Sequence, residues 1–185
     1  PSVPGIADKL YPPQERKLEK VKKYWKSFLT LQPIHEIYGD IPLSEKDISI
    51  DHFIPWSYVA HDEFWNLHPT TRSINSSKSN HLPDWNTYFP SFAKLEYCSY
   101  QMIWKSDTIH NEFEKCAKEH LNDPAIRIKL YQKDQDFLSF SQILEEILKP
   151  VYQSAKNCGF QNWIYEGTLK SERGSIPSPL SLSIS

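Results

Sequence analysis

Residues 50–83 of the chain read IDHFIPWSYVAHDEFWNLHPTTRSINSSKSNHLP. The stretch combines three kinds of polar side chain: the carboxylate of Asp51, the imidazole of His52 and the carboxamides of Asn66 and Asn75. Oxygen ligands suit a hard divalent cation, and a neutral imidazole is a suitable general base near pH 7. Cleavage of a phosphodiester needs an activated water and stabilisation of the charge on phosphorus. The stretch therefore predicts a metal-dependent site for that reaction.

The same stretch predicts a β-hairpin followed by one helix. Apolar and polar residues alternate over 48–54, which is typical of a strand, and Pro55 stops the alternation. Residues 56–65 read as a loop, and residues 66–70 can form a second strand that returns antiparallel. A helix is expected from about 74 to 80, with Ser73 as its N-cap.

The rest of the chain reads as mostly helical, because apolar residues recur at helical spacing. Helices are expected over residues 14–31, 91–105 and 107–121, from residue 124, and around residues 140–148. The predicted fold class is therefore α+β, with a small ββα motif embedded in a mostly α-helical domain. The predicted organisation is a lead-in (proline-rich over 1–13) with a helix (1–33), a core (34–90), a helical extension (91–170) and a Ser/Pro-rich tail (171–185).

Composition limits the function classes. The chain has 185 residues, of which 39% are hydrophobic, and a formal net charge of −2. This composition is globular, and binding to nucleic acid through overall charge is disfavoured. A local basic patch at residues 15–26 could contact nucleic acid, although a solvated helix face is the ordinary alternative.

The cysteines and the apolar segments bear on location. Three cysteines without a C-x-x-C pair indicate reduced thiols in a cytoplasmic protein. No stretch is long and apolar enough to span a membrane. The chain begins at Pro1, which is compatible with a fragment that lacks an N-terminal recognition module.

The motifs in residues 50–83 resemble the HNH endonucleases, which have the ββα-metal fold. The likeness is closest to the HNH domain of RNA-guided CRISPR nucleases and of related phage and bacterial nucleases. It is carried by the D-H-x-I-P-x-S start, the single Asn before the second strand and the N-x-x-K-S-x-x-x-P end. The matching stretch covers about 34 of the 185 residues.

The resemblance assigns a role to each position. Metal ligands for Mg²⁺ or Mn²⁺ would be Asp51 and Asn75, and the general base would be His52, oriented by Asn66. Contacts with phosphate or with the cleaved strand would come from Lys78 and Arg72.

Each of these residues also has an ordinary structural alternative. A histidine on an apolar strand can be a hydrogen-bonded core residue, and an aspartate can lie on the surface. An asparagine near a helix start or in a loop can be a cap or an Asx turn, and a lysine or arginine on a helix can be merely solvated.

One departure from the family concerns zinc. Many HNH proteins bind a structural zinc through C-x-x-C pairs, whereas Thr71 and Ile74 occupy those positions here. The spacing of His61, His68 and His81 matches no common zinc pattern. We therefore expect no structural zinc.

Taken together, these residues predict a metal-dependent endonuclease that acts on DNA, with phage defence, restriction or a mobile element as its setting. Two alternatives stay open at this stage. One is a non-catalytic module that binds nucleic acid or supports assembly, and the other is an RNA-cleaving nuclease of the same fold.

Overall fold

The computed structural model describes residues 17–167. Its helices and strands follow in this order: α1 (Glu19–Leu31), β1 (Ile48–His52), α2 (Trp56–Val59), the 3-10 helix η2 (Phe64–Asn66), β2 (Leu67–Thr71), α3 (Arg72–Lys78), β3 (Leu82–Pro83), α4 (Trp85–Lys105), α5 (Asp107–His120), α6 (Pro124–Leu130), α7 (Phe137–Asn157) and β4 (Asn162–Trp163). The predicted lead-in at residues 1–13 and the tail at residues 171–185 lie outside the described residues.

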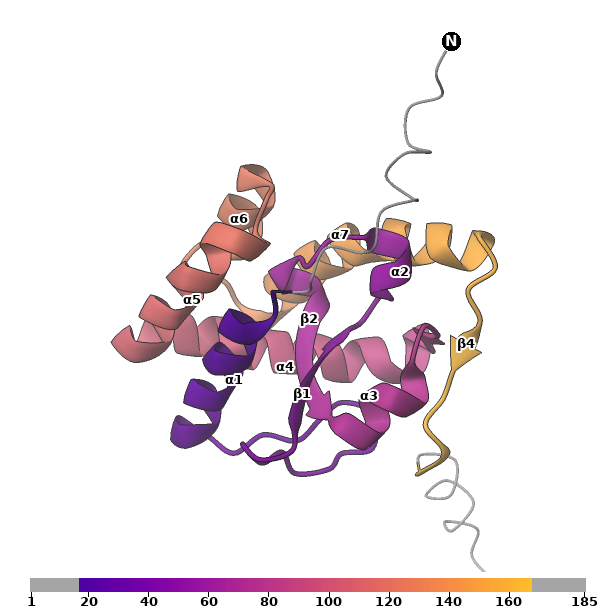
Figure 1. The fold of residues 1–185 in the computed structure, drawn as a ribbon. Coiled ribbons are helices and arrows are strands. Elements are labelled where there is room, and N and C mark those ends of the chain that lie inside the picture. Colours follow the sequence, from indigo (N-terminus) through magenta and orange to yellow (C-terminus); the bar gives the residue numbers. More distant parts are fainter. Residues whose placement is uncertain (1–16, 168–185) are drawn as a thin grey trace, which may run out of the picture.

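A β-hairpin and the helix after it occupy the centre of the molecule (Figure 1). β1 and β2 pair antiparallel, with Asp51 opposite His68 and His52 opposite Leu67. α3 follows directly on β2, and most of the remaining structure is helical. The predicted α+β fold class, with a ββα motif inside a mostly helical chain, is confirmed.

The boundaries of α3 differ from the prediction. The helix begins at Arg72, two residues before the expected start, because β2 continues straight into it. Its N-cap is Thr71, whose hydroxyl accepts a hydrogen bond from the backbone N–H of Ile74 at 3.2 Å. Ser73, the predicted cap, lies inside the first turn. The helix ends at Lys78, two residues earlier than expected, and Ser79 after it has a positive φ of 48°.

α4 also begins earlier than the helix predicted over 91–105. Asp84 caps it by accepting a hydrogen bond from the backbone N–H of Thr87 at 3.0 Å. Pro90 lies within the helix, and because proline has no N–H and usually interrupts a helix, the sequence favoured a start after it. α6 begins at Pro124, as expected, and Asp123 caps it by accepting a hydrogen bond from the backbone N–H of Ala125 at 2.8 Å.

Helices lie on both sides of the hairpin and behind it. α1 and α3 flank it, and α4 passes behind it in the view of Figure 1. Phe53 stacks on Phe92 of α4 with ring centroids 4.4 Å apart. As a result Asp51 and His52 are each only 4% exposed. A hairpin and one helix are marginal alone, so this packing stabilises the motif.

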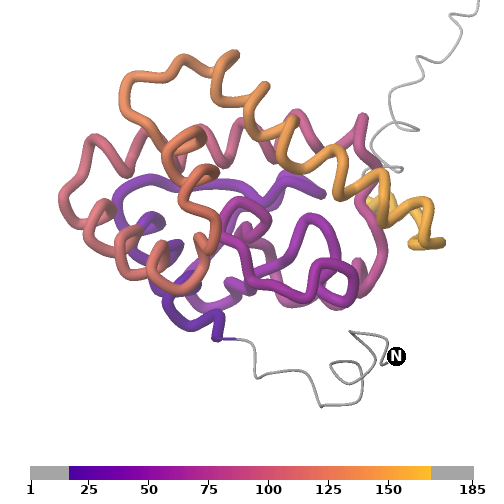
Figure 2. The backbone as a smooth tube through the Cα atoms, turned by 90° about the horizontal axis from the view of Figure 1, so that it is seen from above, coloured from indigo at the N-terminus to yellow at the C-terminus, as the bar shows by residue number. Residues whose placement is uncertain are grey.

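The C-terminal part of the described chain closes around the same centre. α5 packs on α1, and α7 runs alongside α4, as Figure 2 shows from above. β3 and β4 pair in parallel, with Leu82 opposite Asn162 and Pro83 opposite Trp163. Trp163 also packs edge-on against Tyr38, with ring centroids 5.0 Å apart. No helix of residues 17–167 has the length and apolarity needed to cross a membrane.

Candidate functional site

A polar cavity of about 390 Å³ lies where β1, the start of α2 and α3 meet. Three of the residues singled out from the sequence line it: Asp51, His52 and Asn75. Strict strand alternation would place Asp51 and His52 on opposite faces. Both nevertheless line the cavity, and they are the last two residues of β1.

The Asp51 carboxylate is held by three side chains. The hydroxyl of Tyr38 donates to Oδ2 at 2.7 Å, His68 Nε2 lies 3.2 Å from the same oxygen, and Lys78 Nζ donates to Oδ1 at 3.1 Å. Burial by itself raises the pKa of Asp51, but the charge of Lys78 and the contacts with His68 and Tyr38 outweigh it and hold that pKa well below its ordinary value. The carboxylate is therefore ionised and fixed in orientation.

Lys78 does not have the role predicted from the sequence. Its side chain is fully buried, and its ammonium also donates to the backbone oxygen of His52 at 2.7 Å. Burial lowers the pKa of Lys78, and Asp51 offsets part of that effect. An ammonium enclosed in this way is not placed to contact phosphate; it is the counter-charge of Asp51. Arg72 is exposed at the start of α3 and donates to Lys46 O at 3.3 Å, so it is still accessible to nucleic acid.

Asn75 presents one oxygen to the cavity. Its amide nitrogen donates to Ser49 Oγ at 2.8 Å and to Ile50 O at 3.1 Å. With the nitrogen fixed against β1, the carboxamide oxygen is the atom that can accept from a donor or bind a cation. Among residues 17–167 no group of three His, Cys, Asp or Glu side chains is arranged to hold a metal ion. One carboxylate, one carboxamide and water still fit Mg²⁺, which usually keeps several waters.

Asn66 holds the loop after β1 and does not contact the His52 ring directly. Its carboxamide nitrogen donates to Ile54 O at 2.9 Å, and its oxygen accepts from Ile54 N at 2.8 Å. Both polar groups are thus engaged by one residue just beyond β1. Among the hydrogen bonds of the described residues, none joins Asn66 to the His52 ring, so the predicted direct contact is corrected: any influence of Asn66 on His52 passes through the loop.

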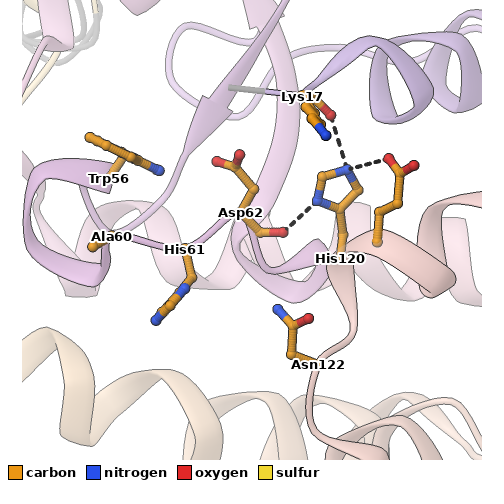
Figure 3. A pocket seen from close by; sticks show the side chains of 8 residues that line it. Lys17, Trp56, Ala60, His61, Asp62, His120 and Asn122 are labelled. Carbon is orange, nitrogen blue, oxygen red and sulfur yellow. Dashed lines mark hydrogen bonds and ion pairs between the residues drawn. The ribbon is translucent and has the colours of Figure 1, made fainter. Parts of the chain in front are cut away.

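The partner of the His52 ring is Asp62. Nε2 of His52 lies 2.7 Å from Asp62 Oδ1. Asp62 lines a second cavity, of about 320 Å³, which adjoins the first because Trp56 lines both. Figure 3 shows this second cavity, with His120 of α5 beside Asp62.

The sequence interpretation missed Tyr38, His68 and Asp62. For His68 a signal was present, because pairing of the predicted strands places it near Asp51. Tyr38 lies in an irregular segment and Asp62 in a loop, where no periodicity indicates which way a side chain points.

The lysine-rich first helix is partly neutralised within the protein. Lys20 pairs with Glu119 and Lys23 with Glu112, both on α5. These pairs favour the ordinary alternative for the basic patch, a solvated helix face. Some of its lysines anchor α1 to α5 through ion pairs.

Comparison with protein families finds a match for the segment that carries the cavity. Residues 36–84 match the family model described as HNH endonuclease. The match confirms the resemblance at the level of the superfamily, and the closer likeness to CRISPR-type nucleases stays a prediction. No curated protein and no solved structure matches the chain. The matched segment contains the cavity residues Asp51, His52 and Asn75 but not His120.

Proposed function

We propose that this chain, which its residues 36–84 place in the HNH endonuclease superfamily, is a metal-dependent endonuclease that hydrolyses phosphodiester bonds in DNA. The observation that carries the proposal is the convergence of a fixed carboxylate, an imidazole and a carboxamide oxygen on one polar cavity. These groups come from the C-terminal end of β1 and from α3, and the proposed reaction needs each of them.

Asp51 and Asn75 would hold the cation. When bound there, Mg²⁺ or Mn²⁺ supplies stabilisation of the negative charge that develops on the phosphoryl oxygens and on the leaving oxygen. Tyr38, His68 and Lys78 keep Asp51 ionised and oriented for that role. Such supporting contacts are a general requirement of metal ligands.

His52 is the general base. Its imidazole accepts a proton from a water molecule, whose oxygen then forms a bond to phosphorus as the bond to the 3′ oxygen breaks. The leaving 3′ oxygen takes up a proton from solvent. The products are a 5′-phosphate and a 3′-hydroxyl.

DNA is the proposed substrate and Arg72 the proposed phosphate contact, because it is exposed at the start of the helix that carries Asn75. An RNA substrate and a non-catalytic binding role are the alternatives. The proposed setting is phage defence or a mobile element in the cytoplasm, with target recognition supplied by a further module.

The test is nicking of supercoiled plasmid and cutting of single-stranded DNA and RNA, in Mg²⁺, Mn²⁺ or EDTA. His52→Ala and Asn75→Ala run in parallel with His110→Ala, a matched control on α5 that removes a partly exposed histidine outside both cavities. We expect cleavage in the divalent metals only, with loss in the first two variants and retention in the control.

Other outcomes decide between the alternatives. Cleavage confined to RNA would identify the RNA-cleaving nuclease. A folded protein that binds DNA and cuts neither nucleic acid would support the non-catalytic module. Cleavage that persists in His52→Ala would refute the assignment of the base.

A further inference from the structure

The ring of His52 makes its short side-chain contact with a residue that the sequence motif did not include. Nε2 of His52 lies 2.7 Å from Asp62 Oδ1, and only 5% and 16% of the two side chains are exposed. Asp62 lies ten residues further along the chain, in the loop between α2 and η2. A contact of this length between a carboxylate and a ring nitrogen is a strong, charge-assisted hydrogen bond.

We infer that Asp62 is the positioning residue of His52: its carboxylate holds the imidazole in the Nε2–H tautomer, so that Nδ1 carries the lone pair that accepts the proton of water. The inference rests on the proposed function, and it adds a residue to that site. An ionised carboxylate only accepts hydrogen bonds, so the hydrogen between the two groups belongs to Nε2. A neutral imidazole has one N–H, and Nδ1 is then its acceptor.

The positions of the two cavities agree with these separate roles of the two ring nitrogens of His52. His52 lines the cavity that contains Asp51 and Asn75, whereas Asp62 lines the neighbouring cavity. The carboxylate therefore engages the ring from outside the space where the cation and the attacked phosphate would lie. The base keeps one nitrogen for the reaction and uses the other to fix its orientation.

Helix α5 holds the loop that carries Asp62. His120, the last residue of α5, is buried, and its Nδ1 lies 2.7 Å from Asp62 O (Figure 3). Its Nε2 lies 3.1 Å from Lys17 O, just before α1. One side chain thus ties the backbone of Asp62 to two helices. The helical extension, which lies outside the matched residues 36–84, takes part in aligning the base.

The next residue provides a matched control for a loop anchor without contact to the base. Glu63 Oε1 accepts from the carboxamide of Asn122 at 2.8 Å, and this bond also ties the loop to the segment after α5. Glu63→Gln keeps one acceptor oxygen for Asn122, removes the charge and replaces the second oxygen with an NH2 donor. Asp62→Asn makes the same chemical change one residue earlier, where the partner is His52.

The experiment has one readout that needs no activity. In the full chain labelled with ¹⁵N-histidine, two-bond and three-bond ¹H–¹⁵N correlations at about pH 8, where an ordinary histidine is neutral, identify the tautomer of each ring. His52→Gln assigns the His52 signals. We expect the Nε2–H tautomer for His52 in the wild type and in Glu63→Gln, and a mixture or the Nδ1–H tautomer in Asp62→Asn, because a carboxamide can donate as well as accept.

Steady-state cleavage provides the second readout. We expect Asp62→Asn to lower kcat by about 10- to 100-fold with KM within about twofold of wild type, as is typical when a supporting hydrogen bond is lost. Glu63→Gln should retain wild-type kcat. An Nδ1–H tautomer in the wild type, or an unchanged kcat in Asp62→Asn, would overturn the inference. A wild type that cuts no nucleic acid would overturn the proposed function. The tautomer, measured without substrate, would still show whether Asp62 fixes the proton of His52 on Nε2.

Discussion

Replacing Lys78 with methionine removes the ammonium that neutralises Asp51 and leaves a buried carboxylate without its counter-charge. Lys78 is fully buried, and its Nζ lies 3.1 Å from Asp51 Oδ1 and 2.7 Å from His52 O. Methionine has nearly the same length, so the variant isolates the loss of charge and of two hydrogen bonds. We expect Lys78→Met to be strongly destabilised.

The magnitude follows from the surroundings of Asp51. Removing one partner of a buried ion pair costs about 3–5 kcal/mol. Asp51 keeps its contacts with Tyr38 and His68, so we expect the lower end of that range. For a chain of this size, about 3 kcal/mol corresponds to a fall in Tm of roughly 6–12 °C. A lysine that only contacted phosphate from the surface would cost within about 0.5 kcal/mol.

Urea denaturation followed by tryptophan fluorescence measures the difference, with Lys94→Met on the exposed side of α4 as the control. In Lys78→Met the negative charge of Asp51, the proposed cation ligand, is no longer neutralised by the ammonium. Added Mg²⁺ should therefore bind more tightly to the variant and raise its Tm more than that of the wild type. A loss below about 1 kcal/mol for Lys78→Met would refute the buried pair. An equal effect of Mg²⁺ on both proteins would refute the link between the pair and the cation.

Three further expectations concern other parts of the molecule. Asn66→Ala leaves the N–H and C=O of Ile54 unpaired, so we expect a loss of about 2–3 kcal/mol in urea denaturation. Burial raises the pKa of Glu96 well above its ordinary value, so the folded state binds more protons than the unfolded state and stability falls as pH rises above about 4.3, by up to about 1.4 kcal/mol per pH unit. Glu96→Gln should lack this fall and therefore gain stability relative to wild type at pH 7. Arg72→Ala should raise KM for DNA at unchanged kcat and reduce the slope of log affinity against log salt by about 1.

Each expectation has a contradicting result. A loss of less than about 0.5 kcal/mol in Asn66→Ala would mean that water or another group replaces its bonds. A stability difference between wild type and Glu96→Gln that does not change with pH would contradict the raised pKa. An unchanged salt dependence in Arg72→Ala would remove that residue from the nucleic-acid surface.

The secondary structure was predictable where periodicity was strong. The alternation through Ile48 and Ile50, stopped by Pro55, located β1, and helical spacing located the long helices. The errors lie at boundaries where a neighbouring element decides. β2 leads straight into α3, so the cap moves to Thr71, and packing of the first turns of α4 outweighs the missing N–H of Pro90.

The candidate site was predictable in its composition and less so in its contacts. A ββα motif brings Asp51, His52 and Asn75 to one cavity. Lys78 lies one turn after Asn75 on the same side of α3 and points into the motif. A lysine is usually expected to be exposed, but here its ion pair with Asp51 compensates the cost of burial. The contact between His120 and Asp62 joins segments 58 residues apart, and only the packed structure reveals it.

The parallel pairing of β3 with β4 bears on how the motif could be reused. Trp163 lies edge-on against Tyr38, and Tyr38 in turn holds the carboxylate of Asp51. Residues 36–84 are therefore unsuitable for grafting alone, since that segment would lose the rings of Tyr88 and Trp163, against which Tyr38 packs. A transplant that preserves this aromatic packing has to extend from residue 36 through Trp163. A circular permutant should have its new termini outside residues 36–163.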